Sequence, residues 1–154
     1  MNIKSTRLDR FSCFILVFFF TVSLPIICHA AEYVSVDHDG IRIRSGPSTD
    51  HEIYWEVFKN YPLKVLDRKG KWLHVEDFEG DKGWIYSPLT NKKDTVIVKV
   101  DKANIRVGPG TNYERTATAL YGVVFTKHKK EGDWIQISHN DGTKGWIYRE
   151  LIWP

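Results

Sequence analysis

One pattern in this 154-residue chain occurs twice, at a constant offset of 62 residues. Arg-Ser-Gly-Pro-Ser-Thr at 44–49 returns as Arg-Val-Gly-Pro-Gly-Thr at 106–111, and Lys-Gly-Trp-Ile-Tyr at 82–86 returns unchanged at 144–148. Because no gap is needed between the matched positions, we infer that one small folding unit was used twice. Comparing the two copies therefore separates what the fold requires from what one copy does alone.

The repeat sets the domain organisation that we expect. Residues 32–90 align with 94–152 and share 18 identical positions. The join at 91–93 is short and polar and has no Gly, Ser or Pro, so we predict that the units are held close together rather than loosely tethered. The predicted segments are a signal peptide at 1–30, a first domain at 32–90 and a second domain at 94–154.

The first thirty residues have the pattern of a secretory leader. Positive charges precede an apolar run at 11–27, and small residues follow at the predicted cleavage point after Ala30. The run is near the lower limit for crossing a bilayer, so an uncleaved anchor is the alternative. Both cysteines, Cys13 and Cys28, lie in this leader. We therefore predict an exported protein of the periplasm or cell envelope whose folded part has no disulfide.

The leader also carries much of the net charge. The chain has a formal charge of +3, and removing the three positive charges and one negative charge of the leader leaves about +1. A nearly neutral protein has no long-range attraction for nucleic acid. The basic run at 127–130 is better explained as a solvated hairpin tip. We expect no nucleic-acid partner, and membrane contact only through an uncleaved leader.

Short alternating runs of apolar and polar residues, separated by glycine-containing turns, predict the fold class. Such runs occur at 34–36, 41–43, 73–75, 96–100, 105–107 and 135–137. No stretch of a dozen residues keeps a helical period. The expected structure is all-β, with two tandem small β barrels and little or no helix outside the signal peptide. A single 3₁₀ turn is expected at 87–89 and again at 149–151.

Four ordered elements, each present twice, resemble the bacterial SH3 (SH3b) domain family. They are a strand ending in Ile-Arg, the Gly-Pro loop, a Gly-x-Trp hairpin and a closing Gly-Trp-Ile, and they cover essentially all of 32–154. The segments 50–55 and 61–65 are similar to tandem SH3-like exported proteins of Gram-negative bacteria. The resemblance implies SH3-like barrels. It also implies a ligand that is a peptidoglycan stem peptide or an extended peptide of an envelope protein.

Strand alternation assigns three aromatic residues of each copy to the outer face, because their neighbours on the strand belong to the core. They are Trp72, Trp84 and Tyr86 in the first copy and Trp134, Trp146 and Tyr148 in the second. In eukaryotic SH3 domains, aromatics at comparable places line a groove for proline-rich peptides, so we hypothesise a similar groove here. The alternative is that these rings cap the small barrels or fill the contact between the copies.

Two further aromatics are not shared by the copies. Tyr54 and Trp55 stand where the second copy has Thr116 and Ala117, so the repeated fold does not require them. They are candidates for a function of the first copy alone, although packing against the neighbouring unit explains them better. The terminal Trp153-Pro154 pair also lies outside the repeat and is expected to dock.

Arg44 and Arg106 precede the Gly-Pro loop in both copies. A guanidinium at this position could bind a ligand carboxylate through two hydrogen bonds. It could equally tie the carbonyls of the loop to the sheet, and its recurrence beside a turn favours this structural use.

Signals for catalysis are weak. The histidines are scattered, no nucleophile motif occurs, and the acidic residues of 76–81 are explained by a solvated turn, with calcium binding as a remote option. We predict no catalytic residue, no metal and no cofactor. The expected function is a non-enzymatic binding or scaffolding module of the cell envelope. The alternative is a purely structural protein-interaction module without a small ligand.

Overall fold

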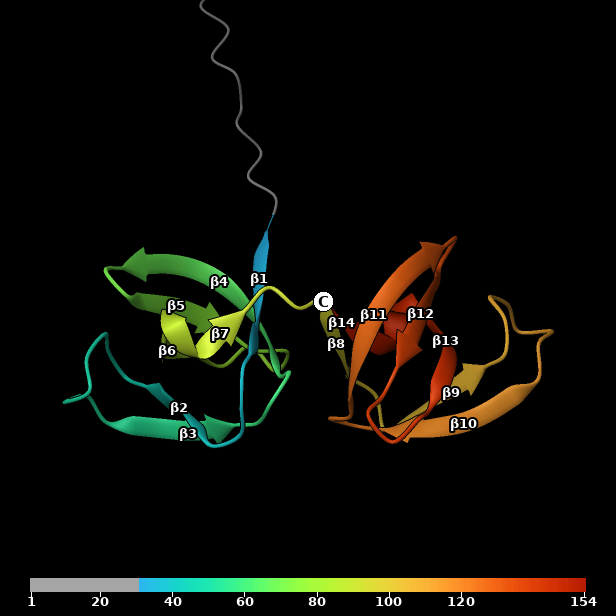
Figure 1. Ribbon diagram of the computed structural model, residues 1–154, viewed down its shortest axis with the longest axis horizontal. Coiled ribbons are helices and arrows are strands. Elements are labelled where there is room, and N and C mark those ends of the chain that lie inside the picture. The colour runs from blue at the N-terminus through green and yellow to red at the C-terminus, as the bar shows by residue number, and fades with distance from the viewer. Residues whose placement is uncertain (1–30) are drawn as a thin grey trace, which may run out of the picture.

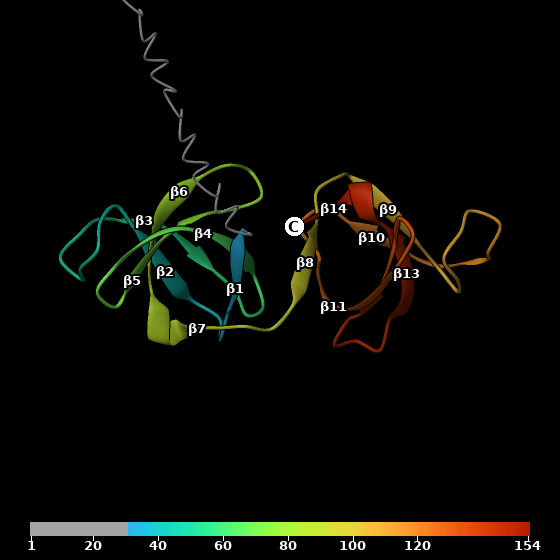
Figure 2. The same cartoon turned by 90° about the horizontal axis from the view of Figure 1, so that it is seen from above.

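The computed structural model describes residues 31–154, so the predicted signal peptide lies outside the described residues. Those residues form two antiparallel sheets of seven strands each, side by side in Figures 1 and 2. No helix among residues 31–154 has both the length and the apolar character needed to cross a bilayer. The prediction of an all-β chain made of two small barrels is confirmed.

The first unit, Glu32 to Asn91, has the sheet order β3-β2-β6-β5-β4-β1-β7. Its elements are β1 (Glu32–Val36), β2 (Ile41–Arg44), β3 (Ile53–Val57), β4 (Pro62–Lys69), β5 (Trp72–Glu76), β6 (Lys82–Tyr86), a 3₁₀ turn η1 (Ser87–Leu89) and β7 (Thr90–Asn91).

The second unit, Thr95 to Trp153, repeats that order as β10-β9-β13-β12-β11-β8-β14. Its elements are β8 (Thr95–Val98), β9 (Lys102–Arg106), β10 (Arg115–Leu120), β11 (Val124–Glu131), β12 (Trp134–Ser138), β13 (Lys144–Tyr148), a 3₁₀ turn η2 (Arg149–Leu151) and β14 (Ile152–Trp153). Both 3₁₀ turns coincide with the predicted ranges.

Each barrel is built on the alternation seen in the sequence. In β5 the buried residues are Leu73 and Val75, and in β12 they are Ile135 and Ile137. The strand pairs β4–β5 and β11–β12 each contain an irregularity in register. Such bulges bend a strand and increase its twist, which lets a short sheet curl over its own core. The hairpin between β4 and β5 turns at Gly70, whose φ is 59°, a conformation that glycine adopts without strain.

The two units pack against each other, as the short join predicted. Ser35 Oγ and Thr95 Oγ1 form a buried hydrogen bond of 2.5 Å, and Ser35 Oγ also donates to the Lys93 carbonyl at 2.7 Å. Trp153 packs against the core of the first unit and meets the Tyr33 ring edge-on, 5.5 Å between centroids. The C terminus accordingly lies between the units in both views (Figures 1 and 2). The predicted docking of the C-terminal Trp is therefore confirmed.

A second inter-unit contact involves a phenol and a carboxylate. The Tyr121 hydroxyl donates to Glu79 Oε1 at 2.5 Å, and the Tyr121 ring lies 5.3 Å from that of Phe78. The hydrogen bond to Glu79 is the main reason that the pKa of Tyr121 is raised to about 12. A carboxylate acceptor stabilises the protonated phenol, because ionisation would remove the shared proton and place two negative charges together.

This hydrogen bond predicts an alkaline transition at the inter-unit contact. The pKa of Tyr121 is raised on folding, so the bond contributes fully below pH about 10 and is lost as the pH rises through about 12. A phenolate absorbance titration of the protein minus that of Tyr121→Phe should show a midpoint near 12. Glu79→Gln should move that midpoint toward 10. An unchanged difference titration in Glu79→Gln would contradict the assignment.

Candidate ligand grooves

A groove on the first unit is lined by Trp72 and Tyr86 of the β5–β6 hairpin. The two residues are cross-strand partners, and their ring centroids lie 5.4 Å apart at an angle of 55°. Arg44 at the end of β2 and Thr49 in the following loop also line it. The groove has a volume of about 580 Å³. The lining therefore combines two aromatic residues with an arginine and a threonine.

The second unit has the same groove at the equivalent positions. Trp134 and Tyr148 are cross-strand partners with ring centroids 5.6 Å apart at 60°, and Arg106 and Thr111 also line the groove. Its volume is also about 580 Å³. The two units therefore share a groove as well as a backbone fold, with its residues 62 positions apart.

The arginines hold the loop that forms one side of each groove. Arg44 Nη1 donates to the carbonyls of Thr49 and His51 at 2.9 and 2.8 Å. Arg106 Nη1 donates to the Tyr113 carbonyl at 2.7 Å. The favoured structural use of both arginines is thus observed. Since each guanidinium also lines its groove, a single group shapes the wall and supplies positive charge there.

A ring folded back over a glycine completes each loop. A Cβ at Gly46 would lie 2.5 to 2.6 Å from the His51 imidazole, and one at Gly108 would lie 2.5 Å from the Tyr113 ring. Any larger residue would therefore push the ring away and open the loop. The shared glycine is explained by this close approach, and the ring can differ between copies because only its flat face is needed.

The structure divides the predicted set of three outer-face aromatics. Trp84 shares the outer face of the hairpin with Trp72. Its own cross-strand partner is His74, and the two rings stack with centroids 4.9 Å apart, so Trp84 does not line the groove. Trp146, its equivalent, is only 6% exposed and has the Lys129 ammonium 5.0 Å from its ring centroid. Trp146 therefore keeps its place beside Ile147 on the strand, but a long cationic side chain covers its ring.

Tyr54 and Trp55 lie away from both grooves and do not form the predicted packing against the other unit. Tyr54 is 54% exposed on β3, an edge strand. Trp55 packs against the core of its own unit, and its Nε1 is buried without a hydrogen-bond partner. The inter-unit explanation is corrected accordingly: Trp55 packs on the core of the first barrel beside Ile43.

Sequence reasoning missed several groove residues. Thr49 with Thr111, and Leu89 with Leu151, line the two grooves in matching places. All four belong to pairs that are identical between the copies, so the repeat contained the signal. Arg42 and its counterpart Asn104 also line the grooves but differ in charge, and no sequence pattern distinguishes them from other exposed strand residues.

The acidic turn of the first unit is less solvated than predicted. Asp77 is 5% exposed, and its Oδ1 accepts hydrogen bonds from the amides of Glu79 and Asp81, both at 2.9 Å. Its Oδ2 accepts one from the Tyr61 hydroxyl at 3.3 Å. Burial raises the pKa of Asp77, and the two amide bonds oppose that shift. Asp77 therefore acts as the hydrogen-bonding centre of its own turn.

The family model described as "Bacterial SH3 domain" matches residues 38–92 and again 99–154. The chain belongs to the bacterial SH3 domain family. Both matches include the residues of a groove described above. The resemblance inferred from the Gly-Pro loop and the Gly-Trp-Ile strand is thus confirmed for both copies of this bacterial SH3 chain.

Curated relatives of this bacterial SH3 chain include two proteins that are named as amidases. It is 31% identical over 125 residues to the putative N-acetylmuramoyl-L-alanine amidase YrvJ of Bacillus subtilis, covering 74% of the chain and 24% of that protein. It is 33% identical over 54 residues to the probable cell wall amidase LytH of Staphylococcus epidermidis, covering 34% of the chain and 19% of that protein. The chain thus spans about a quarter or less of these relatives' lengths.

Solved structures similar to the chain include NlpC2 from Trichomonas vaginalis, with 12% identity and a TM-score of 0.37, covering 81% of this chain and 48% of that one. An NlpC/P60 family protein from Bacillus cereus has 13% identity and a TM-score of 0.35, covering 79% and 56%.

Proposed function

We propose that this protein is a non-enzymatic binding module of the cell envelope that recognises extended peptides of the cell wall, namely peptidoglycan stem peptides. The observation that carries the proposal is the groove found twice, with Trp, Tyr, Arg, Thr and Leu at equivalent positions. In this proposal the leader at 1–30 directs export to the periplasm or envelope, and domains at 32–90 and 94–154 each provide one groove.

The chemistry of the groove suits a short peptide that carries carboxylates. The faces of Trp72 and Tyr86 offer apolar area for aliphatic side chains and peptide planes. Arg44 lines the same groove, where it can bind a ligand carboxylate with donors other than the Nη1 that holds the loop. A hydroxyl beside it, that of Thr49, can bind a peptide group.

Packing between the units does not account for the groove aromatics. The aromatic residues in the inter-unit contacts described above are Tyr33, Trp153, Phe78 and Tyr121. Trp72 and Trp134 instead line recesses on separate units. Because different aromatic residues form the inter-unit contact and the grooves, we favour a ligand-binding use of the grooves over a purely structural module.

The relatives support a wall polymer as the source of the peptide. The bacterial SH3 family model matches both copies, and two curated relatives are named as amidases. These relatives favour peptidoglycan over an unrelated protein as the ligand. Two grooves on units that pack against each other also favour a repetitive polymer, since a second groove can then bind at a high effective concentration.

Purified peptidoglycan sacculi test this proposal. The full chain should be retained with a saturable isotherm and should release no soluble muropeptides. Retention should fall only modestly with salt, because aromatic contacts provide most of the binding. Failure to be retained at any salt concentration would contradict the proposal, and released muropeptides would identify an enzyme.

A further inference from the structure

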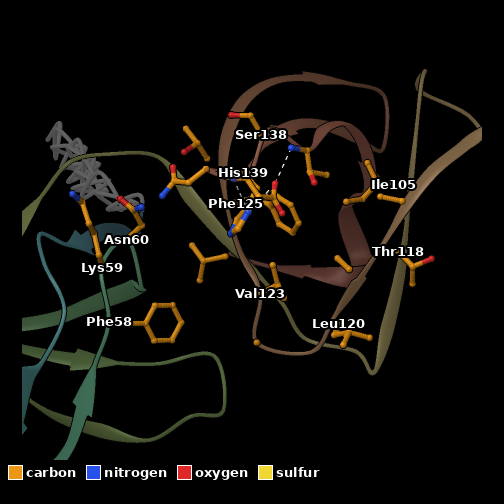
Figure 3. A pocket seen from close by; sticks show the side chains of 18 of the residues that line it. Phe58, Lys59, Asn60, Ile105, Thr118, Leu120, Val123, Phe125, Ser138 and His139 are labelled. Atoms are coloured by element: carbon orange, nitrogen blue, oxygen red, sulfur yellow. Dashed lines mark hydrogen bonds and ion pairs between the residues drawn. The ribbon is translucent and has the colours of Figure 1, made fainter.

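A pocket of about 520 Å³ opens in the second unit, on the side that faces the first. Its inner wall includes Ile105, Ala117, Ala119 and Phe125, and Ser138 and His139 lie at its edge. Figure 3 shows Phe58, Lys59 and Asn60 of the first unit across its mouth. This size is within the range of small-ligand sites in proteins.

The pocket exists because the second copy has small residues where the first has rings. In the first unit, Trp55 pairs with Ile43 across β2 and β3 and packs on the core. The equivalent pair in the second unit is Ala117 with Ile105. An indole is thereby replaced by a methyl group at the same place in the same fold.

Two further substitutions enlarge the same space. Tyr61 and Phe78 form an aromatic pair in the first unit, with centroids 6.2 Å apart, and both pack against its core. Their counterparts in the second unit are Val123 and Asn140, which line the pocket. Phe125 in place of Leu63 recovers part of the lost volume, but the pocket remains open.

The remaining wall is suited to a flat ring. Phe125 and His139 meet edge-to-face, 5.5 Å between centroids, and both line the pocket. His139 is held by Asp141, with 3.0 Å between Nδ1 and Oδ1. A ring entering here would find the edge or face of two aromatic groups, the arrangement that aromatic rings prefer.

We propose that the second unit binds a compact aromatic ring in this pocket, in the place that Trp55 and its neighbours take in the first unit. The ring belongs either to a free aromatic compound or to an aromatic side chain of a peptide. Asn60, Asn140 and Asp141 also line the pocket, and their polar groups can form hydrogen bonds with a substituent on the ring. This site is distinct from the two grooves and does not depend on their ligand.

Alanine methyl groups provide the readout, because the whole chain contains only five alanines. Ala117 and Ala119 line the pocket, whereas Ala31, an exposed residue before β1, does not line it and serves as an internal control. Adding indole to the full chain labelled at alanine methyls should shift the resonances of Ala117 and Ala119 saturably. The expected Kd is about 1 mM, and the Ala31 resonance should stay in place.

Three comparisons make the test specific. Ala117→Trp, which restores the residue of the first copy, should abolish the shift at Ala119. Thr116→Tyr, the neighbouring copy exchange, should leave binding unchanged. Cyclohexanol should bind at least several-fold more weakly than indole, and the tripeptide Gly-Trp-Gly should bind only if the pocket takes peptide side chains.

Each outcome bears on the proposal. Saturable indole shifts that disappear in Ala117→Trp support it, and binding of the tripeptide then decides the source of the ring. Absence of saturable shifts in the wild-type protein would overturn it even if Ala117→Trp fails to fold. Binding of cyclohexanol as tight as that of indole would overturn the aromatic specificity.

Discussion

Replacing Trp72 and Trp134 together by alanine is expected to weaken retention on peptidoglycan sacculi by about 100-fold. Each tryptophan lines its groove together with a neighbouring tyrosine ring, that of Tyr86 or Tyr148. Truncating such a ring at a binding site commonly costs about 2 kcal/mol or more, which is roughly 30-fold. Losing both rings also removes the gain from two-site binding, whereas either single variant retains one intact groove.

Trp84→Ala is the matched control for this effect. Trp84 occupies the same β5–β6 hairpin and the same outer face as Trp72, but it stacks on His74 instead of lining the groove. Its loss should leave retention within about 2-fold while costing the unit a comparable amount of buried aromatic surface. Thermal unfolding of all variants, followed by circular dichroism, separates a loss of binding from a loss of folding.

Gly145→Ala is expected to destabilise the second unit by about 3 kcal/mol. A Cβ on Gly145 would lie 2.6 Å from the Arg106 carbonyl oxygen and 2.6 Å from Ile105 Cγ2. The carbonyl belongs to backbone that is fixed where β9 pairs with β13, so it cannot move without disturbing the sheet. A Cβ on Gly83 would likewise meet Ile43 and the Arg44 carbonyl oxygen. This shared lack of space explains why both copies have glycine in the Lys-Gly-Trp sequence.

Gly132→Ala provides the comparison for Gly145→Ala. Gly132 has a φ of 56°, and a Cβ added there would meet nothing within 4 Å, so alanine introduces backbone strain without a clash. That variant should lose only about 1 kcal/mol. Denaturant unfolding of both variants gives the difference. Equal losses would show that the close approach of β9 and β13 is not what requires glycine at 145.

Much of the fold could be predicted from the sequence because the determining signals are local. The alternation of Leu73 and Val75 with polar neighbours identifies core strands, and glycine in the hairpin turns marks their ends. The repeat then doubles every such signal, which is why both 3₁₀ turns could be located to the residue.

The groove could be predicted only in part because it forms from segments that are distant in the chain. Alternation correctly assigns Trp72, Trp84 and Tyr86 to one face of the hairpin. Which of them lines a recess depends on where the loop after Arg44 folds, and that position is set by hydrogen bonds to carbonyls. The burial of Trp146 depends on Lys129 of a neighbouring strand, which alternation does not reveal.

The unshared Trp55 shows how a difference between copies can be misread. A large residue present in one copy suggests a private function of that copy, but here Trp55 completes the first core. The consequence of the difference lies in the other copy, where Ala117 leaves a pocket open. Small residues give no signal of their own, so this site becomes visible only when both barrels are compared in three dimensions.

Parallel retention isotherms on purified sacculi for the wild-type chain, Trp72→Ala/Trp134→Ala and Trp84→Ala test the central claim most directly. If the two grooves bind the wall, the double variant loses about 100-fold while Trp84→Ala and the wild type stay within about 2-fold of each other. Retention of a folded double variant at the wild-type level would show that the twice-formed groove is not the binding site.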